Sequence, residues 1–320
     1  MAVREKHKKI VVIGGGTGSF SVLRGLKKHP LSITAVVSMF DSGGSSGILR
    51  DEFGVLPPGD VRRCLLALSD EKEEKVLRDL FMFRFNKRTS LNGHSFGNLF
   101  LAALSSIMKD EMKAIEKAGE LLKIKGTVLP VSLNKSHVHA KLEDGSVIKG
   151  ETNIDVPKHN GDIRIEKVFL KPKARLGKDA RRSILEADVI VIGPGDLYSS
   201  LIPNLLTDGM KDVLKRSKAK KVYVTNLMTK WGETNNLSIS DCAREILSYA
   251  GLSRFDYIIS NNKKMDADAL RSYRREKKQP LLIDKEVFKL AGKVIEAPLF
   301  SGKKVVRHDS NALAKIIAKL

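Results

Sequence analysis

Short apolar runs alternate with helical patterns along most of the chain. The first unit reads as a strand at 9–13, a helix at 19–28 and a strand at 33–37, with a glycine-rich turn after the first strand. Strands that alternate with helices predict an α/β fold, built as a doubly wound, mainly parallel Rossmann-like sheet. Further strands are expected at 187–192, 221–225 and 255–260, and further helices at 61–69, 72–84, 96–108, 111–123, 238–249 and 311–320.

In the middle of the chain, apolar residues recur with a different period. Between residues 127 and 171 apolar and polar side chains alternate one by one, and Asp144-Gly145 is a hairpin turn signal. The pattern therefore divides the chain into residues 1–125, the N-terminal half of a nucleotide-binding α/β domain, residues 126–175, a β-rich insertion, and residues 176–320, the C-terminal half of the same domain.

The net charge of the chain suggests nucleic acid as a partner, but the distribution of the charged residues does not support it. The chain has 57 Lys and Arg against 37 Asp and Glu, a net charge of +20, and nucleic acid is the first partner that such a charge suggests. The basic residues are spread through the expected helices among acidic ones, and only 6% of residues are aromatic, which leaves few platforms for stacking bases. We interpret the charge as a solvated, lysine-rich surface and expect no specific nucleic-acid partner.

The sequence carries no pattern typical of export or of a membrane span. No apolar run is long enough to cross a bilayer, and the apolar run before Gly14 is too short for a signal peptide. Cys64 and Cys242 lie far apart and form no CxxC pair, as expected in a reducing compartment. We expect a cytoplasmic protein without a membrane span that forms a homo-oligomer.

A glycine-rich segment, Gly14-Gly15-Gly16-Thr17-Gly18, follows the first expected strand. Glycines let the backbone approach a phosphate closely, and the helix that begins here directs its N–H groups and dipole at an anion. No Lys-Ser/Thr follows, so the segment is not a Walker A loop, and it matches the G-x-G-x-x-G fingerprint only in part. It predicts a site for the phosphates of a nucleotide-type ligand. The alternative is a tight turn without a ligand.

A second segment, Asp41-Ser42-Gly43-Gly44-Ser45-Ser46-Gly47, follows the next expected strand. Its small residues favour a backbone nest for an anion, its serines add hydroxyl donors, and Asp41 suits Mg²⁺ or a ribose hydroxyl. Residues 43–47 also fit the G-x-S-x-G pattern of serine hydrolases, which requires a helix directly after the serine. Because residues 39–60 read as a long loop, we do not favour a hydrolase. A surface loop without a ligand is the remaining alternative.

Two further expected helices begin with polar residues. Asp60 is an N-cap candidate, and Arg62 and Arg63 lie in the first turn, where cations oppose the helix dipole unless an anion is near. His94 stands at the start of another helix, with Ser95 as its cap candidate. A histidine there could contact a phosphate, act as an acid or base, or be hydrogen-bonded without such a role.

The second half of the chain repeats this arrangement. Gly193-Pro194-Gly195-Asp196 follows one expected strand, and Thr225-Asn226 follows another, where Asn226 could hydrogen-bond a base or a sugar. Ligands of doubly wound sheets bind beyond the carboxyl ends of the strands. Because each of these segments follows an expected strand, we expect them all to line one crevice.

Seven segments, in this order, resemble the CofD-like superfamily and specifically its gluconeogenesis-factor, or YvcK-like, branch. The resemblance implies a Rossmann-like fold that binds a nucleotide sugar such as UDP-N-acetylglucosamine. It further implies a regulator of carbon metabolism, cell-wall synthesis and cell shape, with protein partners in cell-wall regulation, and a ligand pocket that includes Tyr273 and Arg307. The segments are GGGTG at 14–18, DSGGSSG at 41–47, PPGD at 57–60, GHSFGNL at 93–99, GPGDLYSSLIPNLL at 193–206, TNLMTKWGET at 225–234 and RHD at 307–309.

The other branch of the superfamily comprises the 2-phospho-lactate transferases of deazaflavin cofactor biosynthesis. Their second motif is typically of an Asn-Thr-Gly-Asp-Asp type, whereas Asp41-Ser42-Gly43-Gly44 stands at that place here. We therefore expect a binding regulator without turnover and without a required cofactor. One alternative is a Mg²⁺-dependent transferase that uses Asp41 or Asp60 as metal ligand or catalytic residue. The other is a basic nucleic-acid-binding protein.

The residues expected to bind the nucleotide-type ligand come from all of these segments. They are Gly14, Gly15, Gly16, Thr17, Gly18, Asp41, Ser42, Gly43, Gly44, Ser45, Ser46, Asp60, His94, Ser95, Asn98, Gly193, Gly195, Asp196, Asn226, Tyr273 and Arg307.

Overall fold

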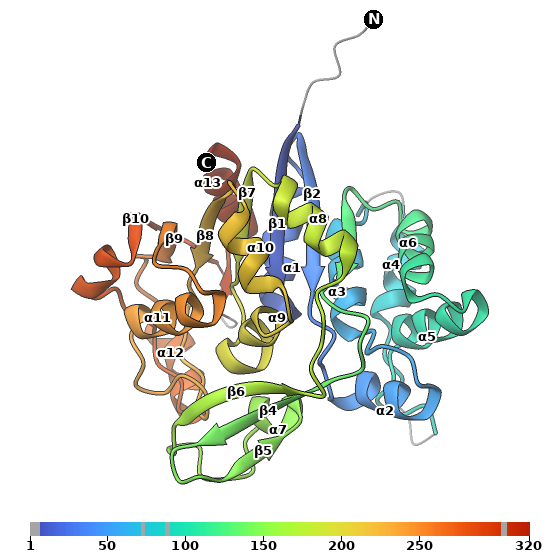
Figure 1. Cartoon of the computed structure of the whole chain (residues 1–320), viewed down its shortest axis with the longest axis horizontal. Helices are drawn as coiled ribbons and strands as arrows, with labels where there is room; N and C mark the ends of the chain where they lie inside the picture. The colour runs from blue at the N-terminus through green and yellow to red at the C-terminus, as the bar shows by residue number, and fades with distance from the viewer. Residues whose placement is uncertain (1–6, 72–73, 87–89, 302–305) are drawn as a thin grey trace, which may run out of the picture.

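A computed structural model describes residues 7–71, 74–86, 90–301 and 306–320. Its central feature is a sheet of seven parallel strands (Figure 1). The strands are β1 (Lys8–Gly14), β2 (Leu31–Val37), β3 (Thr127–Pro130), β7 (Val189–Ile192), β8 (Lys220–Val224), β9 (Phe255–Asn261) and β10 (Ala291–Ala297). They lie in the order β10-β9-β8-β7-β1-β2-β3.

The strand order reverses at β1. The chain places β2 and β3 on one side of β1 and later returns to place β7 to β10 on the other. Ile10 of β1 pairs with Ile33 of β2 and with Val189 of β7, so the three strands run in register toward the same edge. Ligands of doubly wound sheets bind in the crevice that opens at such a reversal. The carboxyl edge between β1 and β7 is therefore the expected place for a site.

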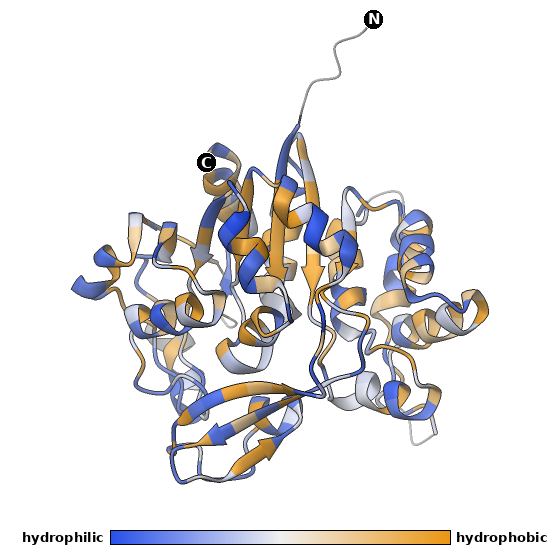
Figure 2. Ribbon diagram, in the orientation of Figure 1, coloured by the Kyte–Doolittle hydropathy of each residue, from blue (hydrophilic) through white to orange (hydrophobic). Residues whose placement is uncertain are grey.

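Apolar side chains cover both faces of the strands. In β1, Val11 and Ile13 belong to one buried cluster, whereas Ile10 and Val12 belong to another. Strands of a parallel sheet are apolar on both faces because helices cover both of them. Figure 2 shows this arrangement, with mostly hydrophobic strands at the centre and helices that alternate between hydrophobic and hydrophilic bands.

The helices of the described chain either pack on the two faces of the sheet or, like the one inside the insertion, lie away from it. They are α1 (Gly16–Leu26), α2 (Gly44–Phe53), α3 (Gly59–Leu68), α4 (Lys75–Met82), α5 (Phe96–Met108), α6 (Glu111–Leu121), α7 (Glu151–Asp155), α8 (Lys178–Glu186), α9 (Ile202–Leu205), α10 (Met210–Arg216), α11 (Ile239–Ala250), α12 (Ala267–Arg275) and α13 (Ser310–Lys319), with a π-helical turn, η1 (Leu197–Leu201), and a 3₁₀ turn, η2 (Lys285–Lys289). Helices α1, α3 and α13 share the cluster of Ile10, and α8, α10 and α11 share the cluster of Val11. This two-sided packing confirms the doubly wound α/β fold.

The expected β-rich insertion is a separate antiparallel sheet of three strands. These are β4 (His137–Leu142), β5 (Val147–Lys149) and β6 (Ile165–Lys171), in the order β5-β4-β6. Asp144-Gly145 forms the turn between β4 and β5, as predicted. The small sheet lies beyond the carboxyl ends of the parallel strands (Figure 1). The first strand assigned to the insertion, β3, pairs in parallel with β2 and therefore belongs to the main sheet.

Several local predictions need correction. The loop expected over residues 39–60 contains helix α2, whose Gly- and Ser-rich first turn hides the helical pattern. This helix ends at Gly54, whose φ of +65° is the left-handed conformation that glycine favours at helix ends. The helix expected at 72–84 begins at Lys75, and residues 72–73 lie outside the described part of the chain. Helices α8 and α12 were not predicted, because they are short and rich in charged residues, and strand β10 was not predicted either.

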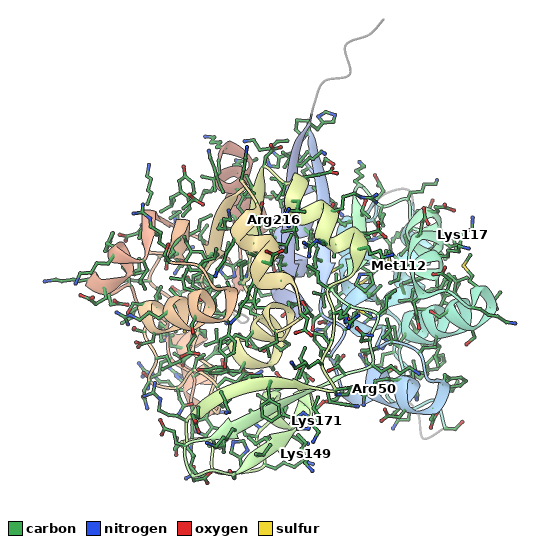
Figure 3. All side chains as sticks on the ribbon, viewed as in Figure 1. Arg50, Met112, Lys117, Lys149, Lys171 and Arg216 are labelled. Carbon is green, nitrogen blue, oxygen red and sulfur yellow. The ribbon has the colours of Figure 1, made fainter. Side chains whose placement is uncertain are left out.

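The basic residues are spread over the molecule. The labelled side chains of Arg50, Lys117, Lys149, Lys171 and Arg216 lie on α2, α6, β5, β6 and α10 (Figure 3). Within the described part of the chain, no helix combines the length and the apolarity that crossing a bilayer would require.

Helices α1 and α13 cross at Gly25. A Cβ atom at Gly25 would lie 2.0 Å from the Ser310 carbonyl oxygen and 2.8 Å from the Ala314 Cβ. We expect Gly25→Ala to lower the free energy of unfolding by about 1–3 kcal/mol, because the helices must move apart, and this outweighs the better helix propensity of alanine. Chemical denaturation measures the change. The control is Gly177→Ala, whose Cβ would come no closer than 3.4 Å to another atom. Equal destabilisation by both variants would contradict the prediction.

Candidate functional site

A cavity of about 540 Å³ opens where the strand order reverses. Four segments that follow strands of the main sheet line it, and they come from residues 15–18 after β1, 41 and 43–46 after β2, 194–196 after β7 and 226–230 after β8. The predicted convergence of the glycine-rich segments on one crevice is thus present in the structure. The volume lies within the usual range for small-molecule sites.

The loops after β1 and β7 touch each other through their backbones. A Cβ atom at Gly18 would lie 2.0 Å from the Pro194 carbonyl oxygen and 3.2 Å from the Gly195 nitrogen. Gly16 begins helix α1 with a φ of +65°, a conformation that residues with side chains rarely adopt. The cavity is therefore bordered here by backbone N–H groups at a helix N-terminus, which is a suitable environment for an anion.

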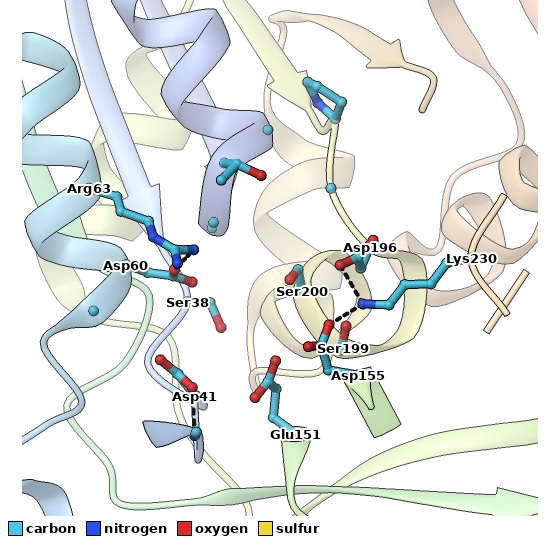
Figure 4. A pocket seen from close by; sticks show the side chains of 18 of the residues that line it. Ser38, Asp41, Asp60, Arg63, Glu151, Asp155, Asp196, Ser199, Ser200 and Lys230 are labelled. Atoms are coloured by element: carbon cyan, nitrogen blue, oxygen red, sulfur yellow. Dashed lines mark hydrogen bonds and ion pairs between the residues drawn. The ribbon is translucent and has the colours of Figure 1, made fainter. Parts of the chain in front are cut away.

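The sequence suggested that Asp60 caps helix α3, but in the structure Asp60 is not the cap. The helix begins at Gly59, and Asp60 lies in its first turn with its carboxylate buried against the glycine loop. A Cβ atom at Gly15 would lie 2.1 Å from Asp60 Oδ2, and Arg63 Nη1 lies 3.7 Å from Asp60 Oδ1 (Figure 4). Burial and the nearby carboxylate of Asp41 raise the pKa of Asp60 to about 6. The carboxylate thus belongs to the cavity wall, because tertiary packing directs it there.

The second segment wraps the N-terminus of α2. The Gly43 N–H donates to Asp41 Oδ1 at 2.8 Å, which orders the turn before the helix. Ser42 does not line the cavity, and its Oγ accepts from the Thr152 N–H at 3.0 Å. Asp41, Gly43 and Gly44 line the cavity together with two buried serines, Ser45 and Ser46.

Helix α2 lies where a loop was expected, and the G-x-S-x-G pattern of serine hydrolases requires a helix at this place. The serine-hydrolase alternative therefore has to be compared with the geometry around Ser45. Helix α2 contains Ser45, and Ser45 Oγ hydrogen-bonds to His94 Nδ1 at 3.1 Å. Among the described residues no carboxylate contacts His94, and His94 itself does not line the cavity. Ser95 caps helix α5, accepting from the Asn98 N–H at 3.2 Å. The pair therefore lacks the third group that orients the base of a catalytic triad.

The loop after β7 is clamped by Asn226. Its Oδ1 accepts from the Gly195 N–H, and its Nδ2 donates to the Gly195 carbonyl oxygen, both at 2.9 Å. These bonds make Asn226 a positioning residue for the loop, and because it also lines the cavity, its contact with a base or sugar stays a prediction. Gly193 lies behind this loop, with a φ of +80°, and does not line the cavity. Gly14 is likewise outside the lining, as the last residue of β1.

Lys230 connects three parts of the site, and the sequence did not single it out. Its ammonium group contacts Asp155 of the insertion, lies 2.7 Å from Asp196 Oδ2 and lies 3.5 Å from Glu233 Oε1 (Figure 4). Burial disfavours the charge of Lys230, but these three carboxylates outweigh it and raise the pKa of Lys230 above its ordinary value. The carboxylates lie close enough together to hold a metal ion. The ammonium group already occupies that position, so this cluster does not fit a divalent cation.

Glu233 fixes the turn that follows the β7 loop. Its Oε2 accepts from the backbone N–H groups of Tyr198 and Ser199 at 2.7 and 3.1 Å, and its Oε1 accepts from Ser199 Oγ at 2.7 Å. These bonds satisfy the first N–H groups of η1. Asp196 and Lys230 are thereby held against a rigid support.

The insertion supplies a carboxylate to the cavity wall. Glu151 of α7 faces the same space as Asp41 and Asp60 (Figure 4). Burial, followed by the charges of Asp41, Asp155 and Asp60, raises the pKa of Glu151 to about 8. Oxygen is the ligand atom that Mg²⁺ prefers, but among the described residues the carboxylate oxygens of Asp41, Asp60 and Glu151 are not gathered closely enough to form a metal site by themselves. No motif marked Glu151, because its position depends on how the small sheet docks.

The two residues implied by the family resemblance lie at another end of the cavity. Tyr273 Oη accepts from the Val306 N–H at 2.9 Å, and Arg307 is exposed at the cavity wall. Arg307 lies on the short strand β12 (Arg307–His308), which pairs with β11 (Phe300–Ser301). Lys278 adds a second positive charge there, with its Nζ 5.8 Å from the centre of the Tyr273 ring.

The raised pKa of Glu151 predicts a pH-dependent stability. A carboxyl whose pKa rises on folding contributes stability below its ordinary pKa of 4.5, and that contribution is lost as the pH rises through about 8. Relative to wild type, Glu151→Gln should therefore gain stability between pH 5 and pH 9. One pKa unit corresponds to about 1.4 kcal/mol, and partial exposure reduces the effect, so we expect about 1–2 kcal/mol.

Thermal unfolding at several pH values measures this difference. Glu116→Gln, on the exposed side of α6, is the control for the substitution itself. A difference between wild type and Glu151→Gln that stays constant across this pH range would contradict the prediction.

The chain is similar over almost its whole length to known proteins. A family model described as 2-phospho-L-lactate transferase CofD matches residues 10–300. The gluconeogenesis factor of Bacillus subtilis (strain 168) is 40% identical over 315 residues, which cover 98% of this chain and 98% of that protein. The gluconeogenesis factor of Halalkalibacterium halodurans is also 40% identical over 315 residues, covering 98% and 96%.

A solved structure agrees with this relationship. The crystal structure of a UPF0052 family member from Bacillus halodurans matches with a TM-score of 0.91 at 39% identity, covering 98% of this chain and 99% of that one. The resemblance of the seven ordered segments is thus confirmed. The chain belongs to the CofD (UPF0052) family, within which its relatives at 40% identity are named gluconeogenesis factor.

Proposed function

We propose that this protein binds a nucleotide sugar of the UDP-N-acetylglucosamine type and acts as a regulator without turnover. One observation carries the proposal. A polar cavity opens at the reversal of the strand order, where the glycine loops after β1 and β7 meet. This is the position at which doubly wound sheets bind nucleotides.

The walls of the cavity suit the parts of such a ligand. The N-terminus of α1, with Thr17 and Gly18, offers backbone N–H groups to a diphosphate. The guanidinium group of Arg307 would pair with phosphate oxygens, and the Tyr273 ring offers an apolar surface beside it. Carboxylates such as Asp196 would accept hydrogen bonds from sugar hydroxyls. The ligand would thus meet positive charge at its phosphates and acceptors at its sugar.

The regulatory role is proposed from the relatives. Proteins at 40% identity over nearly the whole chain are named gluconeogenesis factor, which supports a role in carbon metabolism. The resemblance to the same branch supports further roles in cell-wall synthesis and cell shape, with protein partners there.

A second candidate is a Mg²⁺-dependent transferase acting on a nucleotide-activated donor. Asp41 and Asp60 favour it, because carboxylates that line the same cavity as the phosphate-binding loops would supply oxygen ligands to Mg²⁺ together with the donor. The description of the family model as a transferase adds support. In this candidate the metal would supply charge stabilisation for a transferred phospho-group, and Asp41 or Asp60 would hold it.

The nucleotide-sugar proposal predicts a defined loss in Arg307→Ala. Binding of UDP-N-acetylglucosamine should weaken by about 1.5–3 kcal/mol, as for a lost charge-assisted hydrogen bond. Because Arg307 is exposed, the melting temperature of the free protein should not change. Calorimetric titration measures the affinity, with Arg216→Ala on α10, outside the cavity lining, as the control.

A ligand at about 100 times its dissociation constant adds about 2.7 kcal/mol of stability. If no UDP-sugar raises the melting temperature of wild type, the proposed ligand class is wrong.

Metal dependence separates the two candidates. A binding regulator should hold UDP-N-acetylglucosamine almost as tightly in EDTA as in Mg²⁺, and Asp41→Asn should bind it in either condition. A transferase should need Mg²⁺, and Asp41→Asn should lose turnover because a hard oxygen ligand is gone. Titrations with and without EDTA measure this. Binding that requires Mg²⁺ and fails in Asp41→Asn would favour the transferase.

A further inference from the structure

Three arginines line one corner of the cavity, and only one of them has a carboxylate partner. Arg62, Arg63 and Arg84 all border the cavity. Arg63 Nη1 lies 3.7 Å from Asp60 Oδ1. Among the described residues, neither Arg62 nor Arg84 forms an ion pair. The corner therefore carries an excess of positive charge.

The guanidinium group of Arg62 is held in a buried position. Only 8% of the residue is exposed, its Nε donates to Asn98 Oδ1 at 2.8 Å, and its Nη1 donates to the Phe81 carbonyl oxygen at 3.1 Å. Burial, and then the like charges of Arg63 and Arg84, lower the pKa of Arg62 to about 10. Both hydrogen-bond partners of Arg62 are neutral, and only the carboxylate of Asp60, which forms no ion pair with it, favours its charge.

Gly97 of helix α5 leaves space for the Arg62 side chain. A Cβ atom at Gly97 would lie 2.6 Å from Arg62 Cδ and 2.8 Å from the Phe81 carbonyl oxygen. The stem of Arg62 can therefore cross the helix only because residue 97 has no side chain. The fold thus holds the buried guanidinium group of Arg62 at the cavity wall and not at the outer surface of the protein.

The hydrogen bonds of Asn98 with Arg62 also orient the hydroxyl groups of Ser45 and Ser46. Because Asn98 Oδ1 accepts from Arg62, its Nδ2 is the donor, and it donates to Ser45 Oγ at 3.2 Å and to Ser46 Oγ at 3.4 Å. Both serines line the cavity beside the N-terminus of α2. Each hydroxyl that accepts from Asn98 keeps its own proton, which Ser46 can donate to a ligand and Ser45 can share with His94.

We propose that Arg62, Arg63, Arg84, Ser45 and Ser46 form a site for a compact phosphate dianion, either free phosphate or the phosphate of a monoester, as a second ligand beside the nucleotide sugar. The two serines come from α2, Arg62 and Arg63 from α3, and Arg84 from the segment between α4 and α5, on the β2 side of the strand reversal. The crevice for a diphosphate lies between β1 and β7. Arg63 stands between this corner and the crevice, since its Nη1 would lie 3.7 Å from a Cβ atom at Gly16. Forked guanidinium groups and hydroxyls are the usual partners of phosphate.

The test is calorimetric titration of the full chain with inorganic phosphate and, separately, with glycerol 3-phosphate, both against chloride at equal ionic strength. Arg84→Gln is the variant, because Arg84 is exposed and its loss should not affect folding. Arg216→Gln, on α10 and outside the cavity lining, is the matched control. We expect a defined affinity of wild type for at least one probe, weakened about tenfold or more in Arg84→Gln and unchanged in Arg216→Gln.

A second titration is made in saturating UDP-N-acetylglucosamine. The proposal expects the phosphate probe still to bind, because the two sites are separate. It is overturned if wild type responds to phosphate no more than to chloride, if Arg84→Gln binds as wild type does, or if the nucleotide sugar displaces the probe. If the nucleotide sugar itself does not bind, the proposed function fails, while the first titration still decides on the phosphate site.

Discussion

The site depends on one close contact between two backbones. The loops after β1 and β7 meet at Gly18 and Pro194, where any side chain at residue 18 would overlap the Pro194 carbonyl oxygen. Asn226 holds the second loop from the far side through both atoms of its amide, and Glu233 holds the turn that follows. The parallel sheet brings the loops together, and these polar side chains keep them there. The cavity is therefore bordered by rigid backbone at its centre and by longer side chains only at its ends.

Charge is distributed unevenly around that centre. Asp41, Asp60 and Glu151 crowd together on one wall, whereas Arg62 and Arg84 stand nearby without carboxylate partners among the described residues. Like charges held close together destabilise the free protein, and a ligand of complementary charge relieves that repulsion. Such an arrangement is typical of a site shaped for a ligand rather than for maximal stability. It also explains why local cap and turn rules misplaced Asp60, whose carboxylate serves the cavity.

The repeating pattern of strands and helices was enough to predict the sheet and the meeting of its glycine loops. This succeeds because parallel strands end at one edge, so a motif after any strand reaches the same crevice. Helix α2 was missed because glycine and serine in its first turn resemble a loop. Lys230 and Glu151 were missed for another reason. Their positions depend on the docking of the small sheet, through contacts such as that of Lys230 with Asp155, and no periodicity encodes such contacts.

The reversal of strand order also governs when the site can form during synthesis. The Lys9 N–H bonds to the Asp188 carboxylate, 179 positions further along the chain, so β1 is made long before its neighbour β7. Until more than half of the 320 residues have been made, β1 has a partner on one side only. An apolar strand with a free edge is a hazard for wrong pairing and aggregation. The order of strands that creates the crevice therefore leaves one edge of β1 unpaired until the second half of the chain has been translated.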